Sequence, residues 1–489
     1  MRFRVPYYIL STPGFKPPNI SKTWFFGVRY TRRRLSRHEP MDYPNIKKQD
    51  QEIYEILKKE ECRQAEGLEL IPSENYASAA VMESMGSILT NKYSEGYPKK
   101  RYYAGNEHVD DLEILAIERC KKLFGVPFVN VQPYSGSPAN LAVYMATCQP
   151  KDHVMGLALP DGGHLTHGWK VSATAIFYDS LQYHVREDGR IDMDELWKLA
   201  KEHKPKLIWA GGTAYPYAYE YDKFAEVADS IGAYLAADIA HVAGLIVAGA
   251  HPSPVSHAHI VTTTTHKTLR GPRGGIIMAT QKGLDKDPEL ADRIDKAVFP
   301  GLQGGPHDHQ TGAIAIALKE AATEEFKVYG RQIVANAKAL AASLLKRGLK
   351  LVSGGTENHL LLLDLAPVFG PGGGIFAHEA LDAAGMTANK NAIPKDPSTP
   401  FYPSGLRLGT PALTTRGMKE AEMEKVGEWI FRAIQAVKDR RLPAGKEARA
   451  VYLAEFKKSV KTNAALLKIK EEIKVLTKDF PVPGVATKA

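Results

Sequence analysis

Between residues 128 and 280, short apolar runs alternate with segments of helical pattern. Strands that alternate with helices form a mostly parallel sheet with helices on both faces. The sequence therefore predicts an α/β fold. Helices are expected between the strands, for example at 192–203, with Asp192 as N-cap, and at 221–231. The expected strands are 128–132, 153–158, 175–179, 206–211, 233–238, 259–265 and 274–280.

Helical patterns dominate the chain on both sides of this region. Helices are expected at 47–66, which Gly67 would end, at 77–90, at 109–124, and through most of 307–347. Strands near 349–353 and 358–364 and further helices then predict a smaller α+β domain. The expected parts are a leader (1–40), a helical arm (41–78), a large domain (79–318) and a small C-terminal domain (319–489).

The leader carries most of the net charge. Its nine lysines and arginines against Glu39 account for +8 of the +9 of the whole chain, so the body is nearly neutral. A neutral body disfavours a basic RNA-binding protein. The arginine-rich leader is typical of an organellar transit peptide or of an arm that contacts RNA or membrane, but its prolines break a helix. We favour an upstream extension with Met41 as the first residue, because helical patterning begins just after it.

Cysteine and histidine spacing restrict the chemistry. Cys62, Cys120 and Cys148 are far apart and form no CxxC pair, so a reducing compartment such as the cytoplasm is expected. A mitochondrial matrix location is the alternative if the leader is a transit peptide. No metal site is expected, because there is no HExxH or clustered Cys/His motif. No apolar run approaches the roughly 18–20 residues of a membrane span.

One lysine follows an unusual strand. In VTTTTHKTLRGPRGG (261–275), β-branched threonines favour extended chain, and the glycines and Pro272 then force a turn. Lys267 would stand at the strand end, where a shielded, unprotonated amine forms a Schiff base. A solvated surface lysine is the alternative.

Three other strand ends carry distinctive polar residues. Ser135, Gly136 and Ser137 would open a helix whose free N–H groups bind phosphate, or Ser135 would be an ordinary N-cap. Asp238 ends an apolar run and would pair with a cationic ring nitrogen, or cap the next turn. In LPDGGHLTHG (159–168), His164 or His167 could stack on a flat ring or lie on a surface loop.

Taken together, these four features predict a pyridoxal phosphate site. Ligands bind beyond the carboxyl ends of strands in open α/β sheets, and each feature follows such an end. A phosphate cup, a ring-nitrogen carboxylate, a stacking histidine and a Schiff-base lysine are what this cofactor requires. Each alternative is credible alone, but all of them together are not.

Long motifs then resemble the serine hydroxymethyltransferase family, over about residues 45–480. This resemblance implies the type I pyridoxal phosphate fold, a homodimer or dimer of dimers, and reversible transfer of a one-carbon unit from L-serine to tetrahydrofolate, giving glycine and 5,10-methylenetetrahydrofolate. Besides the lysine segment, the motifs are LIPSENYAS (70–78), LTNKYSEGYPKKRYYAGNEHVD (89–110), NVQPYSGSPAN (130–140), DIAHVAGLIVAG (238–249), FPGLQGGPHDH (299–309) and SGLRLGTPALTTRG (404–417).

The resemblance also implies roles for single residues. For the cofactor, Lys267 is implied as the covalent attachment point, with His266 beside it, Asp238 at the ring nitrogen and His164 on the ring. Thr213 and His241 are implied near the ring hydroxyl. The phosphate would be bound by Ser135, Gly136 and Ser137, together with Gly304 and Gly305 of the neighbouring subunit. For the amino acid they are Arg407 at the carboxylate, assisted by Ser73, and Tyr93, Glu95, Tyr102 and Tyr103 from the partner subunit, with Glu95 in proton transfer. The folate site takes Tyr102, Leu159, Gly163, His164, Leu165, Asn391, Ser398, Thr399, Pro400 and Phe401.

A pyridoxal phosphate-dependent threonine or β-hydroxy amino acid aldolase without folate is the competing function. The Glu95 segment and LPDGGHLTHG favour the hydroxymethyltransferase, because an aldolase needs no pterin site. Thr213 stands where the family often has serine, and Pro72 where it usually has alanine; neither change threatens the chemistry. The leader matches nothing in the bacterial type of the family.

Overall fold

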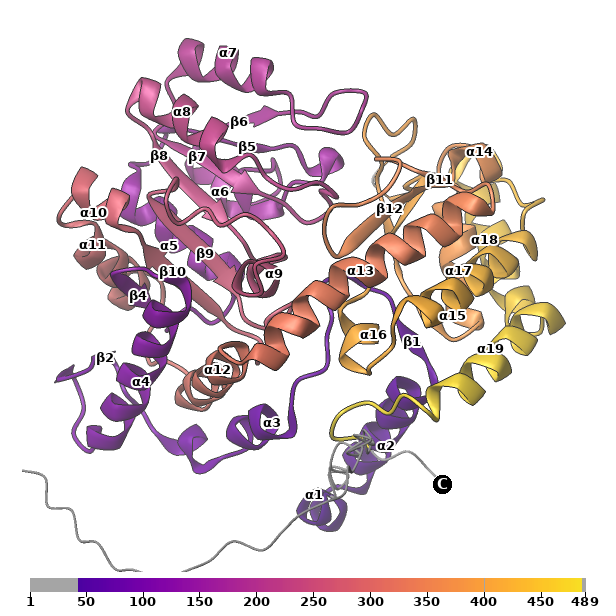
Figure 1. The fold of residues 1–489 in the computed structure, drawn as a ribbon, viewed down its shortest axis with the longest axis horizontal. Helices are drawn as coiled ribbons and strands as arrows, with labels where there is room; N and C mark the ends of the chain where they lie inside the picture. The colour runs from indigo at the N-terminus through magenta and orange to yellow at the C-terminus, as the bar shows by residue number, and fades with distance from the viewer. Residues whose placement is uncertain (1–42, 400, 486–489) are drawn as a thin grey trace, which may run out of the picture. The chain divides into compact units, whose positions relative to one another are not determined.

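The computed structural model describes residues 43–399 and 401–485, and its main feature is a seven-stranded sheet. Five neighbouring strands, β5 to β9, run parallel, whereas β10 is antiparallel to both of its neighbours (Figure 1). The order is β4 (Phe128–Asn130), β10 (Gly275–Ala279), β9 (Ile260–Thr264), β8 (Tyr234–Asp238), β7 (Leu207–Gly211), β5 (His153–Leu157) and β6 (Asp179–Tyr183).

Helices cover both faces of this sheet. Successive residues of a strand point to opposite faces. In β9, Val261 packs in a core with α4, α7, α8 and the start of α13, whereas Ile260 packs in a second core with α5 and α11. The predicted mostly parallel sheet between helices is therefore confirmed. The helices of this region are α3 (Ala79–Met85), α4 (Glu107–Phe124), α5 (Gly136–Thr147), α6 (Ala173–Phe177), α7 (Met193–His203), α8 (Tyr221–Ile231), α9 (Ala243–Val247), α10 (Gln281–Lys286), α11 (Leu290–Lys296) and α12 (Asp308–Ala321).

A four-stranded antiparallel sheet forms the core of the C-terminal region. Its strands run in the order β11 (Lys350–Leu351), β12 (Leu360–Asp364), β15 (Gly405–Gly409) and β14 (Asn389–Asn391). A short parallel pair joins β1 (Leu68–Glu69) to β13 (Met386–Thr387). The helices here are α14 (Ala366–Phe369), α15 (Gly374–Ala383), α16 (Pro411–Thr415), α17 (Glu420–Gln435), α18 (Lys446–Val460) and α19 (Ala464–Thr477).

One long helix, α13 (Glu324–Lys346), belongs to both regions (Figure 1). Phe326 and Ile333 in its first half are buried in the core of the large sheet. Leu340 and Leu344 in its second half are buried in the core of the C-terminal sheet. The two regions therefore share a continuous helix.

The first described helices pack against the last one. Figure 1 shows α2 (Gln51–Glu66), which follows α1 (Pro44–Gln49), close to α19. Arg416 lies between them, 5% exposed, and donates hydrogen bonds to backbone carbonyls at the ends of both helices. The accepting residues are Gln64, Ala65, Gly67, Thr477 and Phe480.

Three secondary-structure predictions were wrong in part. Residues 175–179, expected as a strand, lie mostly in α6, because Ser172 accepts a hydrogen bond from the N–H of Thr174 and opens a helical turn. The strand begins at Asp179 instead. The helix expected at 47–66 is divided at Asp50, whose backbone is extended and whose side chain caps α2 by accepting from the N–H of Ile53. The helix expected at 77–90 ends at Met85, before a 3₁₀ turn over Ile88–Asn91.

Other predictions were confirmed or stay open. Asp192 caps α7 through the N–H of Glu195, and α8 covers the expected residues. The four-part division of the chain stays a prediction. The leader, with the possible start at Met41, lies outside the described residues. In the described part of the chain, no helix is long and apolar enough to cross a membrane.

Candidate active site

Lys267 lies in the turn after β9, as the threonine run predicts. The strand is buried along its whole length, and the Nζ atom of Lys267 donates to Oγ1 of Thr264 at 3.0 Å. Burial lowers the pKa of Lys267 to about 8, against the opposing effect of Asp238. No carboxylate of the described residues lies within ion-pair distance of this amine, so a fraction of it is neutral near physiological pH.

Asp238, at the end of β8, is held by three hydrogen bonds. Its Oδ2 accepts from Nδ2 of Asn140 at 2.9 Å and lies 3.0 Å from Nε2 of His167, and its Oδ1 accepts from the N–H of Ala240. Burial alone would raise the pKa of Asp238, but the His167 hydrogen bond and charge, with His164 and Asn140, bring it below its ordinary value. The carboxylate therefore stays ionised and can face a cationic group.

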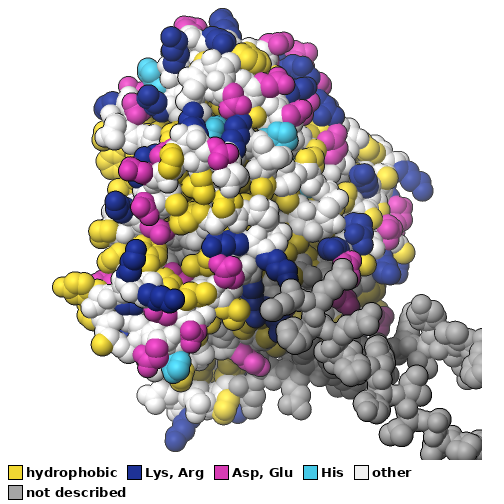
Figure 2. All heavy atoms as spheres, turned by 60° about the vertical axis from the view of Figure 1, so that its left-hand side comes forward, with side chains coloured by type: hydrophobic (Ala, Val, Ile, Leu, Met, Phe, Trp, Pro, Cys, Tyr) yellow, Lys and Arg dark blue, Asp and Glu magenta, His cyan; other side chains and the backbone are white. Residues whose placement is uncertain are grey.

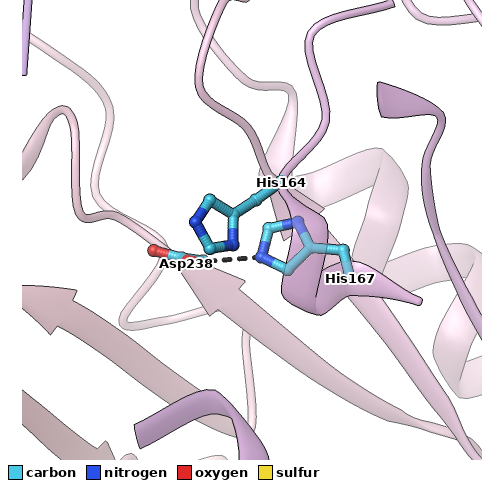
Figure 3. Close-up of side chains that lie close together, drawn as sticks. All are labelled: His164, His167 and Asp238. Atoms are coloured by element: carbon cyan, nitrogen blue, oxygen red, sulfur yellow. Dashed lines mark hydrogen bonds and ion pairs between the residues drawn. The ribbon is translucent and has the colours of Figure 1, made fainter. Parts of the chain in front are cut away.

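His164 and His167 both lie beside Asp238 (Figure 3). Burial lowers the pKa of His164 to about 4, so its ring is neutral at pH 7. Nitrogen and oxygen atoms of His164, His167 and Asp238 lie within 4.8 Å of one another, as metal ligands would. However, Nδ1 of His164 already accepts from the N–H of Thr166, and Nε2 of His167 already meets Asp238. These hydrogen bonds favour a positioning network over a metal site.

The N-terminus of α5 has the features of a phosphate site. Ser135 is the N-cap residue, but its side chain makes no capping hydrogen bond, so ordinary capping is not its role here. A Cβ atom on Gly136 would lie 2.7 Å from the methyl group of Thr264. The helix start therefore packs on the strand end that carries Lys267, with the N–H groups of its first turn available to an anion.

Arg407, on β15, is a partly buried cation that pairs with no carboxylate among the described residues. Its Nη1 donates to the carbonyl of Thr213 at 2.6 Å and its Nε to Oδ1 of Asn389 at 3.2 Å. Burial lowers the pKa of Arg407 to about 10. An unpaired buried guanidinium is costly, so a ligand carboxylate would complete this site.

The segment that holds Ser73 joins the arginine and the lysine. The carbonyl of Leu70 accepts from the N–H of Gly409 at 2.7 Å, and Nδ2 of Asn75 donates to the carbonyl of Lys267 at 2.9 Å. Ser73 therefore lies in a loop fixed at both ends to the predicted site.

His241 and His266 both adjoin the lysine turn: the carbonyl of His241 accepts from Oγ1 of Thr268, and His266 directly precedes Lys267. His241 is buried, its Nδ1 lies 3.1 Å from Nε2 of His359, and its pKa is well below the ordinary value because of burial and the charge of Lys267. Burial likewise lowers the pKa of His266 to about 3, and its Nδ1 has no partner in the described part of the chain. Thr213 donates from Oγ1 to the carbonyl of Gly163.

The predicted folate residues come from two segments. Leu159, Gly163 and Leu165 share the loop of His164, and Leu165 is 45% exposed. Asn391 ends β14 and pairs with Gly405 of β15, while Asn389 of the same strand lies opposite Arg407. Ser398, Thr399 and the exposed Phe401 follow in the loop after it, and Pro400 lies outside the described residues.

The residues expected from a partner subunit form a group of their own. A Cβ atom on Gly304 would lie 3.0 Å from Oε1 of Glu95, and one on Gly305 would lie 3.2 Å from the ring of Tyr93. The rings of Tyr93 and Tyr103 meet edge to face, and Tyr102 is 81% exposed. No hydrogen bond or ion pair between described residues joins Glu95 to Lys267 of the same chain.

Comparison with known proteins identifies the family of this chain. A family model described as serine hydroxymethyltransferase matches residues 46–430. The chain belongs to the serine hydroxymethyltransferase family. It is 54% identical over 437 residues to the serine hydroxymethyltransferases of Acidothermus cellulolyticus and of Sorangium cellulosum, covering 89% of this chain and 96% of each relative. It is 48% identical over 472 residues to the cytosolic serine hydroxymethyltransferase of Oryctolagus cuniculus, covering 92% of this chain and 96% of that protein.

Family membership confirms several predictions. The fold class, the pyridoxal phosphate cofactor with tetrahydrofolate as co-substrate, and a one-carbon transferase rather than an aldolase are those of a serine hydroxymethyltransferase. The donor set of this chain fits the cofactor: an amine of lowered pKa, an ionised buried carboxylate and an uncapped helix N-terminus lie together.

Sequence reasoning missed Asn140 and Asn75, and it did not give His167 the role that the structure indicates. Asn140 and His167 orient Asp238, and Asn75 ties the Ser73 loop to Lys267. Asn140 lies one helical turn after Gly136, on the same face of the helix, so this spacing could have indicated that Asn140 faces the site. His167 was considered only as an alternative to His164, and nothing in the sequence indicates that both meet Asp238.

Proposed function

We propose that this chain transfers a one-carbon unit reversibly between L-serine and tetrahydrofolate through the residues described above. The observation that supports this most is the position of Lys267: a partly buried amine just after β9 that hydrogen-bonds Thr264 and whose pKa is affected by the charges of Asp238 and Arg407.

Bound pyridoxal phosphate supplies an electron sink for the amino acid. Lys267 holds it covalently, and the N–H groups of Gly136 and Ser137 with the Ser135 hydroxyl bind its phosphate. Asp238, kept ionised by His167 and Asn140, holds a proton on the ring nitrogen. His164, neutral at pH 7, would contact the ring without adding charge. Thr213 and His241 would serve the ring hydroxyl, and His266 directly precedes Lys267.

Arg407 binds the serine carboxylate, with Ser73 beside it. Its planar guanidinium suits two parallel hydrogen bonds to a carboxylate. The folate lies between the loop of Leu159, Gly163 and Leu165 and the segment of Asn391, Ser398, Thr399, Pro400 and Phe401.

Two copies of the chain complete the site. Glu95, Tyr93, Tyr102, Tyr103, Gly304 and Gly305 act in the partner's site, where Glu95 exchanges a proton with the serine hydroxyl or folate. A pocket of about 440 Å³ beside Ser137, with Pro138, Leu141 and Leu302 in its lining, supports this arrangement. Leu165 and Val171 at its rim are 45% and 70% exposed. Figure 2 shows hydrophobic side chains across the middle of one face, and a second copy would cover such a surface.

The cytoplasm is the proposed location, which the name of the rabbit relative supports. The function is tested with purified protein, L-serine and tetrahydrofolate, by measuring glycine and 5,10-methylenetetrahydrofolate. The expected result is equal formation of both products. Glycine formation that does not depend on tetrahydrofolate would contradict the proposal.

A further inference from the structure

The position of the Glu95 side chain is determined by its backbone and not by contacts of its carboxylate. It lies directly before β2 (Gly96–Tyr97), which pairs with β3 (Lys100–Arg101) in a short hairpin. The Glu95 carboxylate makes no hydrogen bond or ion pair with any other described residue. The direction of this side chain therefore depends on how firmly the peptide groups around it are held.

Arg101 holds the carbonyl groups of the two residues that flank Glu95. Its Nη1 donates to the carbonyl of Ser94 at 2.9 Å and to the carbonyl of Gly96 at 2.9 Å. Gly96 has φ +97°, and a Cβ atom there would lie 2.4 Å from the carbonyl of Lys100. The hairpin therefore needs a glycine after Glu95, and it needs a hydrogen-bond donor that joins the carbonyls of Ser94 and Gly96.

Two carboxylates of α4 fix the guanidinium. Nη2 of Arg101 lies 2.7 Å from Oε2 of Glu113, and Nε lies 2.8 Å from Oδ1 of Asp110. The side chains of Arg101 and Glu113 are 4% and 2% exposed. Residues three apart share one face of a helix, so α4 presents both acids to one arginine.

A second set of hydrogen bonds ties the hairpin to the sheet. Nε2 of Gln132 donates to the carbonyl of Gly96 and to Oε1 of Glu113, both at 2.9 Å. The hydroxyl of Ser94 donates to Oδ1 of Asp308 at 2.7 Å. These bonds place Arg101 at the centre of a buried polar network, and no atom of that network belongs to the cofactor or serine sites.

We infer that Arg101 is a positioning residue for Glu95, which it orients through the carbonyls of Ser94 and Gly96. This inference rests on the proposed role of Glu95 in proton transfer. Lysine cannot replace Arg101, because one ammonium group cannot meet four acceptors in the plane of a guanidinium. A displacement of about 1 Å at a reacting group can cost roughly 10²-fold in rate.

The test compares Arg101→Lys, Glu95→Gln and the double variant as cofactor-loaded enzymes. Arg101→Lys should lower kcat for folate-dependent transfer about 10²-fold. Cofactor content and the affinity for serine, read from the cofactor spectrum, should change by less than about two-fold, because Arg407 and Lys267 are untouched. Arg119→Lys is the matched control, since Arg119 is a half-buried arginine of α4 that donates to the carbonyl of Ala315.

The double variant separates positioning from general support of the fold. If Arg101 acts through Glu95, the double variant loses no more activity than Glu95→Gln alone. Losses that multiply would overturn the inference, as would wild-type kcat in Arg101→Lys. Wild-type kcat in Glu95→Gln would instead overturn the proposed role of Glu95 itself.

If Arg101→Lys does not fold, Glu113→Gln provides a second test of the inference. It keeps the shape of the side chain and removes one charge that holds Arg101. We expect a smaller loss, about 10-fold, that again disappears when Glu95→Gln is added. A loss that persists in that background would also overturn the inference.

Discussion

At the scale of single residues, burial sets the charge state of the site. It lowers the pKa of Lys267 to about 8 and that of His164 to about 4. Asp238 is the exception, because hydrogen bonds outweigh burial and keep its carboxylate ionised. An amine that is neutral in part near physiological pH, beside an ionised carboxylate, is the combination that binding of an aldehyde with a cationic ring requires.

The pKa of Lys267 predicts how pH affects cofactor binding. Only the neutral amine attacks an aldehyde, and its fraction grows as pH rises through about 8. The rate at which the apo protein binds pyridoxal phosphate covalently should therefore rise over this range, followed by stopped-flow absorbance. Lys267→Ala should lack this phase. A midpoint near 10.4, the ordinary lysine value, would show that the amine is solvated.

Asp238→Asn should lower turnover by about 10²-fold or more, since an amide cannot keep the ring nitrogen protonated. Cofactor should still bind through Lys267 and the α5 N-terminus, which absorbance of the purified variant checks. Asp364→Asn is the control, because Asp364 is a buried, lysine-paired strand-end aspartate of the C-terminal sheet. Near-normal turnover in Asp238→Asn would refute the assignment.

Arg407→Lys should weaken serine binding about 10- to 100-fold, the range of one strong hydrogen bond to a charged group. Cofactor affinity should stay within about two-fold of wild type. A serine titration followed by the cofactor spectrum measures the first, and equilibrium dialysis the second. Equal loss of both affinities would mean that Arg407 maintains the site as a whole.

At the scale of secondary-structure elements, long patterned segments were predictable and short apolar runs were not. The helix at 221–231 matches α8, because its apolar spacing is regular over three turns. Residues 175–179 are apolar and partly β-branched, so a strand and a helical turn fit them equally well. The hydrogen bond between Ser172 and Thr174 decides, and it depends on how the preceding loop is folded.

Arg416 stabilises two helix ends at once, so its loss should be costly. Arg416→Met leaves five carbonyls without their donor, and each buried one costs about 1–3 kcal/mol. Since water can reach some of them, we expect the free energy of unfolding to fall by at least about 3 kcal/mol in urea denaturation. Arg432→Met, which removes a half-exposed pair with Glu472, should cost about 1 kcal/mol or less. Equal effects would show that Arg416 is not the link.

At the scale of the whole molecule, the sequence indicates which residues are candidates for the site but not how they are held. Lys267, Asp238 and His164 were predicted because each stands at or just after the end of a strand, and these strands, β9, β8 and β5, run parallel in one sheet with β7 between β8 and β5. Asn75 and Arg407 reach them from far along the chain, and only folding shows that Asn75 binds the backbone of Lys267. The group of Glu95 and Gly304 carries no sequence signal of its proximity.

Shared sites predict complementation between inactive subunits. Glu95→Gln alone should lose about 10²–10⁴-fold in folate-dependent transfer, and Lys267→Ala should be inactive. Mixed dimers of the two contain one site with native Lys267 from one chain and native Glu95 from the other. Activity should recover toward half of the wild-type value per dimer, measured after subunit exchange verified by differently tagged chains. No recovery would place Glu95 in the site of its own chain.

Helix α13 also limits how such a protein can be recombined. Its first half is part of one core and its second half part of the other, without an exposed linker between them. A chimaera that takes its large sheet from one relative and its C-terminal sheet from another must therefore join them inside a helix packed on both sides. A junction within α13 would have to preserve the packing of buried side chains in both cores at once. The two regions are therefore inherited most easily as a single unit.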